Sequence, residues 1–164
     1  MNAGQLFDKE SARIWETIDA HAEAELTKPI RDDGWTALQI LAHLAIANRG
    51  LLSLAKTHHR AAGAGQEVPV DDSFDVHRWN VEQVALWADR SLADVRNEWA
   101  ETQRRFHEFT ASLSEADLEL PARFVTGKPM SLGELIGSIT LHLRVHRQEI
   151  ERGLAGEVVA PIEH

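Results

Sequence analysis

The sequence of 164 residues contains no cysteine. Disulfide bonds, thiolate metal ligands and a cysteine nucleophile are therefore excluded, and the composition fits a reducing compartment such as the cytoplasm. Basic residues are also scarce, because 17 Lys and Arg stand against 26 Asp and Glu, which gives a net charge of −9. Phosphate backbones and anionic lipids repel such a chain, so we do not expect nucleic acid as its main partner.

Long apolar runs and a signal peptide are absent as well. No segment reaches the roughly 18 uncharged apolar residues that a transmembrane helix needs, and the polar N-terminus lacks an apolar signal core. The length suits one compact domain over residues 1–164, and the hydrophobic fraction of 43% is ordinary for a globular protein. We therefore expect a single soluble, cytoplasmic domain that does not span a membrane.

Strand patterns are also rare, and the best strand candidate is the short segment 123–126. Helix formers and apolar residues at helical spacing dominate elsewhere. The pairs Thr36/Gln39, Ser91/Asp94 and Ser131/Glu134 have the capping-box spacing that begins a helix. The sequence predicts an all-α, antiparallel four-helix bundle with a long loop between helices two and three, its helices covering about 4–27, 36–62, 73–113 and 131–153, the third with a bend at Ser91.

Three histidines lie on the apolar faces of two predicted helices. His142 and His146 are four residues apart, so their imidazoles stand one turn apart and can converge on one cation. His43 lies on the apolar stripe of the second helix. A lone inward histidine is more often a hydrogen-bonded core residue, but three without partners would each cost about 1–3 kcal/mol. A divalent ion would satisfy all three, so His43, His142 and His146 are candidate metal ligands.

The histidine pattern excludes two familiar metal sites. A zincin motif requires glutamate directly after its first histidine, where this chain has Leu143. Carboxylate-bridged di-iron bundles require Glu-x-x-His. The residues three positions before the candidate ligands are Ile40, Ile139 and Leu143, and none of them is acidic. A three-histidine set instead leaves coordination positions open, as catalytic zinc sites do.

Two segments carry a resemblance to a known family. Gly34-Trp35-Thr36 through His43-Leu44, and Ser131-Leu132-Gly133 through Ile150, resemble the corresponding helices of the DinB-like (damage-inducible) superfamily, close to the N-terminal domain of mycothiol-dependent maleylpyruvate isomerases. The resemblance implies a zinc or nickel ion on His43, His142 and His146, and a homodimer. It also implies a thiol cofactor such as mycothiol, bacillithiol or glutathione in some members. The chain ends soon after the fourth helix, so isomerase activity itself is not expected.

Three further residues are candidates near the site. Glu149 is a candidate to orient a ligand or act as a base, although the sequence slightly favours a solvated charge. Asn80 is predicted to contact substrate or an imidazole, with helix capping as the alternative. Arg144, with Arg147, would hold the carboxylates of a thiol cofactor if the pocket opens to that side.

The leading hypothesis is a metal-dependent low-molecular-weight-thiol S-transferase acting on a small-molecule substrate. The metal would bind the cofactor thiol and lower its pKa. One alternative is a metal-dependent hydrolase that uses a metal-bound water. Another is a non-enzymatic, metal-binding stress-response protein.

Overall fold

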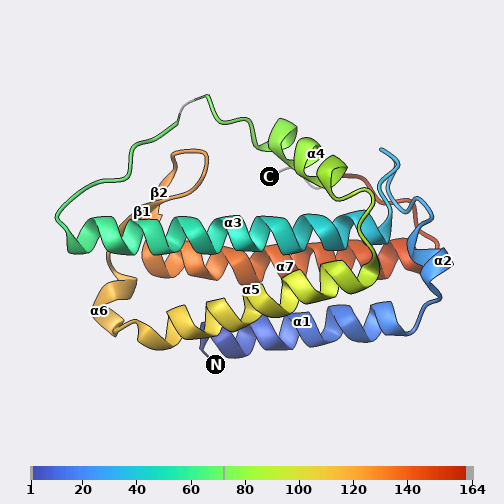
Figure 1. Cartoon of the computed structure of the whole chain (residues 1–164), viewed down its shortest axis with the longest axis horizontal. Coiled ribbons are helices and arrows are strands. Elements are labelled where there is room, and N and C mark those ends of the chain that lie inside the picture. The colour runs from blue at the N-terminus through green and yellow to red at the C-terminus, as the bar shows by residue number, and fades with distance from the viewer. Residues whose placement is uncertain (1, 72, 162–164) are drawn as a thin grey trace.

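Four long helices pack side by side in the computed structural model, which describes residues 2–71 and 73–161 (Figure 1). These bundle helices are α1 (Ala3–Asp19), α3 (Ala37–Gly63), α5 (Leu92–Ser112) and α7 (Leu132–Leu154). The connections contain the short helices α2 (Glu23–Leu26), α4 (Val76–Leu86) and α6 (Glu115–Leu118) and an antiparallel hairpin of β1 (Pro121–Arg123) and β2 (Pro129–Ser131). The predicted all-α four-helix bundle with a long connection after its second helix is confirmed.

The chain direction distinguishes this bundle from a simple up-and-down arrangement. The connection that contains α4 carries the chain back along the bundle, so α3 and α5 run the same way in Figure 1. Helices α1 and α7 run the opposite way. The pairs α3/α7 and α1/α5 are therefore antiparallel, and the long crossover between α3 and α5 is one of the known ways to connect four helices.

The first predicted helix, 4–27, is wrong as a single helix because the chain breaks after Asp19. Ala20 closes α1, Ala22 is extended at φ −68° and ψ 144°, and α2 then begins. The His21 ring stabilises the break, since its Nδ1 lies 2.8 Å from the Thr17 carbonyl oxygen. No glycine or proline occurs between residues 20 and 22, so the sequence carries no strong stop signal there.

The third predicted helix, 73–113, also divides. Helix α4 ends at Leu86, and α5 starts after Ser91, whose hydroxyl accepts from the Asp94 amide in the predicted capping box. The predicted bend at Ser91 is thus a complete break. The strand candidate 123–126 is displaced, because pairing covers residues 121–123 and 129–131 and residues 124–128 form the turn of the hairpin.

Helix α3 is the central helix of the core. Residues 40–48 are all buried, and among the bundle helices α3 packs mainly against α5 and α7. By length and composition alone α3 could cross a membrane, with a mean hydropathy of 1.3 over its most apolar window, but 61% of that window is buried within the bundle. The core therefore accounts for its apolar character.

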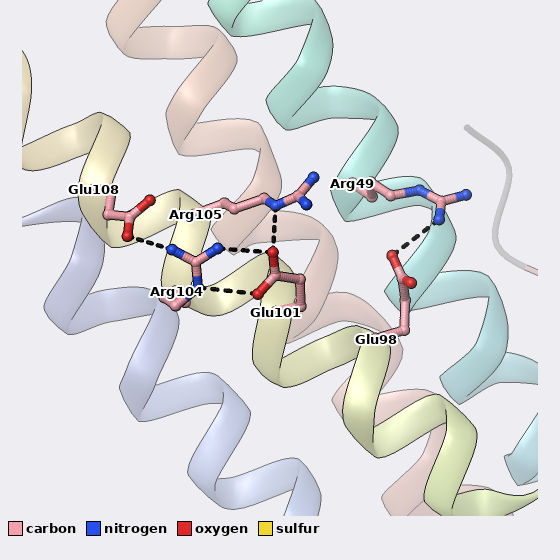
Figure 2. Close-up of polar contacts among 6 residues, drawn as sticks. All are labelled: Arg49, Glu98, Glu101, Arg104, Arg105 and Glu108. Atoms are coloured by element: carbon pink, nitrogen blue, oxygen red, sulfur yellow. Dashed lines mark hydrogen bonds and ion pairs between the residues drawn. The ribbon is translucent and has the colours of Figure 1, made fainter.

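Ion pairs lie on the exposed face of α5 (Figure 2). Arg49 Nη1 lies 3.0 Å from Glu98 Oε1 and links α3 to α5. Arg104 and Arg105 both donate to Glu101, and these hydrogen bonds lower the pKa of Glu101 to about 2. Exposed pairs of this kind contribute little to stability, so the buried apolar core holds the bundle together.

Candidate metal centre

Three imidazoles from the antiparallel helices α3 and α7 converge at one point in the bundle. Their ligand-capable nitrogens all lie within 4.8 Å of one another, and Nε2 of His43 is 3.0 Å from Nε2 of His142. His43 and His146 are 3% and 0% exposed, and His142 is partly buried. The helical spacing of four residues places His142 and His146 one turn apart on α7, as their pattern predicts.

The geometry of the three histidines fits one transition-metal ion. Imidazole nitrogens bind zinc at about 2.0–2.1 Å, which places two ligand nitrogens about 2.8–3.4 Å apart for inter-ligand angles between octahedral and tetrahedral. The His43–His142 nitrogen pair already has this separation. The 4.8 Å limit on the whole set leaves an adjustment of about 1–2 Å, which imidazole side chains reach by small rotations.

Two oxygen acceptors fix which ring nitrogen faces the cluster. The Nδ1 atom of His146 lies 2.5 Å from Glu149 Oε2, and Nδ1 of His142 lies 3.3 Å from Asn48 Oδ1. A carboxylate and an amide oxygen can only accept, so both Nδ1 atoms carry the hydrogen and donate it. The Nε2 atoms then keep their lone pairs, which is the form of histidine that binds metal.

Glu149 is itself held by a buried arginine. Its carboxylate is 2% exposed, and its Oε1 atom lies 3.4 Å from Nε of Arg31. Arg31 also pairs with Asp33 at 2.5 Å and stacks over Trp35, with 4.4 Å from its guanidinium carbon to the ring centroid. A β-bridge between Arg31 and Val159 ties this turn to the C-terminal segment. The contacts of Arg31 thus fix the carboxylate that orients His146.

A cavity of about 600 Å³ opens beside His43 and His142. Residues of α3 and α7 form one side of it, and Phe74, α4 and the turn of the hairpin line the rest. Its lining is mainly apolar and includes the side chains of Leu51, Leu54, Phe74, Trp79, Phe124 and Val145. The histidine cluster therefore lies at the wall of a cavity that is large enough for a small molecule.

The other predicted site residues are placed in three different environments. Glu149 lies against His146, and Asn80 is 8% exposed and lines the cavity from α4. Asn80 does not cap α4, because Asp75 does. Arg144 does not line this cavity, so the condition of its prediction, a pocket that opens to its side, is not met here. Its Nε atom instead lies 3.3 Å from Glu10 Oε1 of α1.

The ion pairs of Glu10 explain the position of Arg144. Arg147 donates to the same carboxylate at 2.9 Å, and Glu10 is 2% exposed. Burial raises the pKa of Glu10, but the hydrogen bonds and charges of Arg147 and Arg144 outweigh it and hold the net pKa below its usual value. These two arginines therefore join α7 to α1 on the side of α7 that faces away from the cavity lining.

Sequence reasoning missed Asn48 and Arg31. Asn48 is a polar residue within the buried run of residues 40–48, and that burial is the signal that it needs a polar partner inside the bundle. Arg31 lies in a turn, and its contact with Glu149 joins residues far apart in the sequence. No local pattern marks that contact.

The fold and the histidine cluster define a class of helical-bundle proteins in which three histidines gather beside a cavity. The family model described as the DinB superfamily matches residues 6–150, and the chain belongs to this superfamily, as its motifs predict.

One solved structure shows the same fold. It is YfiT from Bacillus subtilis, which its description calls "a probable metal-dependent hydrolase with an unusual four-helix bundle topology". The two chains are 20% identical with a TM-score of 0.68, over 92% of this chain and 83% of that one. No curated protein matches the chain at a significant level.

Proposed function

We propose that this protein is a metal-dependent hydrolase in which His43, His142 and His146 hold a divalent ion. The observation that carries the proposal is the convergence of three imidazoles, two of them fixed by oxygen acceptors at Nδ1, at the wall of a cavity. The description of YfiT as a metal-dependent hydrolase, which refers to that protein, supports the same class of activity.

A divalent ion held by His43, His142 and His146 would supply Lewis-acid chemistry for hydrolysis at the wall of the cavity. Imidazole ligands suit zinc and nickel alike. Glu149 and Asn48 keep His146 and His142 in the ligating tautomer and orientation. His43, whose ring centroid lies 5.8 Å from that of Trp35, completes the set from α3. The apolar lining of the cavity restricts bulk water around the substrate.

Thiol transfer is a second candidate, favoured by a cavity with room for both a thiol and its electrophile. The thiol would come from a cofactor, because the chain has no cysteine. Among the described residues that line the cavity, none is Lys or Arg, and Arg144 and Arg147 both pair with Glu10. The carboxylates of glutathione or bacillithiol therefore have no cation to meet in this lining. Mycothiol, which has no carboxylate, is the thiol that suits it better.

The test combines metal content with turnover. Apo-protein is loaded with zinc or nickel and analysed for metal by elemental analysis, as wild type and as His43→Ala, His146→Ala and His58→Ala. His58 is the matched control, since it is a buried histidine of α3 outside the cluster. We expect one ion per chain in wild type and His58→Ala, and loss of the ion in the other two.

Turnover of neutral ester and amide substrates is then measured with and without added thiol. Metal-dependent hydrolysis without thiol is the expected result. Thiol adducts formed only when mycothiol is present would establish the second candidate instead. A wild-type protein that binds no metal after loading would overturn both, and would leave the non-enzymatic alternative without its metal as well.

A further inference from the structure

The lining of the 600 Å³ cavity is poor in charge. Among the described residues that form it there is no Asp, Glu, Lys or Arg, although 43 of the 164 residues of the chain carry these charges. An ionised group buried against apolar walls without a partner is strongly disfavoured. Away from the histidines, the lining therefore favours neutral ligand groups over charged ones, and the cavity volume lies within the range of small-molecule sites.

Most hydroxyl groups of the lining are already engaged. Thr57 Oγ1 donates to the Ser53 carbonyl oxygen at 2.9 Å, and Ser138 Oγ donates to the Leu135 carbonyl oxygen at 2.7 Å. Ser53 is exposed at the surface. Thr57 and Ser138 therefore bond to carbonyl groups of their own helices, and Ser53 can bond to water. These hydroxyls leave little hydrogen-bonding capacity inside the cavity.

The amide of Asn80 differs from these hydroxyls. It is 92% buried and lines the cavity from α4, opposite the helices that carry the histidines. Within residues 2–71 and 73–161, no other side chain or backbone group forms a hydrogen bond with this amide. This amide therefore forms its hydrogen bonds with water or with a ligand in the cavity that it lines.

Aromatic rings line the same cavity as this amide. Trp79 precedes Asn80 in α4 and packs over Gly50 of α3, where an added Cβ atom would lie 3.9 Å from the ring. Phe74 is paired with Trp79, with ring centroids 6.3 Å apart. Such rings provide a broad apolar surface for the body of a ligand.

We propose that the cavity binds an uncharged, largely apolar small molecule with one carbonyl or hydroxyl group, and that Asn80 receives that group. The ligand body would lie against Trp79, Phe74 and the aliphatic side chains of α3 and α7. The proposal rests on the proposed function in one respect, because it treats this cavity as the substrate site. Asn80 is then a specificity residue, since a site built to satisfy a polar group discriminates against analogues that lack it.

Three probes of similar size test the proposal. They are 2-acetylnaphthalene with a neutral carbonyl, 2-ethylnaphthalene with no polar group, and 2-naphthoate with a carboxylate. Binding is followed on the metal-free full chain by amide and indole chemical shifts in two-dimensional NMR, which also show whether the probe occupies the cavity. We expect the acetyl compound to bind about fivefold tighter than the ethyl compound, and naphthoate to bind about tenfold weaker than the acetyl compound or worse.

Two variants locate the source of this discrimination. Asn80→Leu removes the amide while keeping the size of the side chain, and should make the acetyl and ethyl compounds bind equally. Gln83→Leu makes the same chemical change on the same helix outside the cavity lining, and should leave the wild-type preference intact. Thermal melts check that both variants fold. The wild-type comparison of acetylnaphthalene with naphthoate needs no variant at all.

The proposal is overturned if naphthoate binds as tightly as acetylnaphthalene, if no probe shifts the cavity signals, or if Asn80→Leu keeps the wild-type preference. Because binding is measured without metal or turnover, its failure is distinct from failure of the proposed function. Selective binding without hydrolysis would refute the hydrolase alone. Hydrolysis without selectivity would refute the role of Asn80 alone.

Discussion

Replacing Glu149 tests whether its carboxylate sets the metal affinity of the histidine cluster. The carboxylate is 2% exposed, and its Oε2 atom lies 2.5 Å from Nδ1 of His146. In Glu149→Gln a neutral amide oxygen can still accept this hydrogen bond, but without the charge that makes such bonds about twice as strong. In Glu149→Ala the acceptor is lost, and the His146 ring is free to change tautomer and rotate.

The expected loss of zinc affinity differs between these two substitutions. Loss of a partner that orients a ligating histidine typically lowers metal affinity about 10–100-fold, which is about 1.4–2.7 kcal/mol of binding free energy. We place Glu149→Gln near the lower end of this range and Glu149→Ala near the upper end. Arg31 keeps Asp33 as a partner at 2.5 Å. The loss of stability should therefore stay below the ~3–5 kcal/mol of a fully unpaired buried charge.

The assay is the zinc dissociation constant at neutral pH, measured by competition with a chelating indicator, together with urea unfolding of the metal-free protein. Glu10→Gln is the matched control, because Glu10 is equally buried and also bound by arginines but does not contact the histidines. It should lose stability and keep its zinc affinity. Unchanged affinity in Glu149→Ala, or an equal loss in Glu10→Gln, would refute the reasoning.

Two further predictions concern stability. Gly153→Ala should destabilise the protein by about 1–3 kcal/mol, because its Cβ atom would lie 2.6 Å from Cβ of Ile30. Gly137→Ala on the same helix meets open space and should stabilise the protein by about 0.5–1 kcal/mol. Equal shifts in melting temperature for the two variants would contradict this prediction. The net folded-state pKa of Glu10 lies below 4.5, so its stabilising effect is complete above that pH and is lost as the pH falls through the folded value. Urea unfolding at several acidic pH values should therefore show a shallower loss in Glu10→Gln than in wild type, and parallel curves would contradict the role of this carboxylate.

The histidine cluster was predictable because it depends on helical periodicity. Spacings of three and four residues assign His142 and His146 to one face of α7, and the same reasoning places His43 inside α3. Periodicity also made Glu149 a candidate, since it lies seven residues after His142, but it did not decide between a ligand-orienting residue and a solvated charge. Binding of a metal by these residues, like the expected homodimer and cytoplasmic location, stays a prediction.

The partners that come from other helices were not predictable in this way. Asn48 reaches His142 across the α3/α7 contact, and Arg31 reaches Glu149 from a turn. Periodicity placed Arg144 off the histidine face, but it could not show what this side chain contacts. It lies only two residues from His142, but that rotation directs it to Glu10 on α1 instead of the cavity. Periodicity fixes faces within one helix, and only the packing decides what each face meets.

The long crossover links the topology of the fold to its candidate function. Helices α3 and α5 run in the same direction, so the segment between them must return along α3, whose 27 residues span about 40 Å. That segment contains α4 and places Phe74, Trp79 and Asn80 over the cavity. Only Asn80 and Val84 of α4 are buried, so this cover contributes little to the core. The histidines, by contrast, belong to α3 and α7 at the centre of the bundle. Changes in the crossover should therefore alter ligand selection while the bundle and the histidine cluster persist, which separates the part of the site that chooses the substrate from the part that would hold the metal.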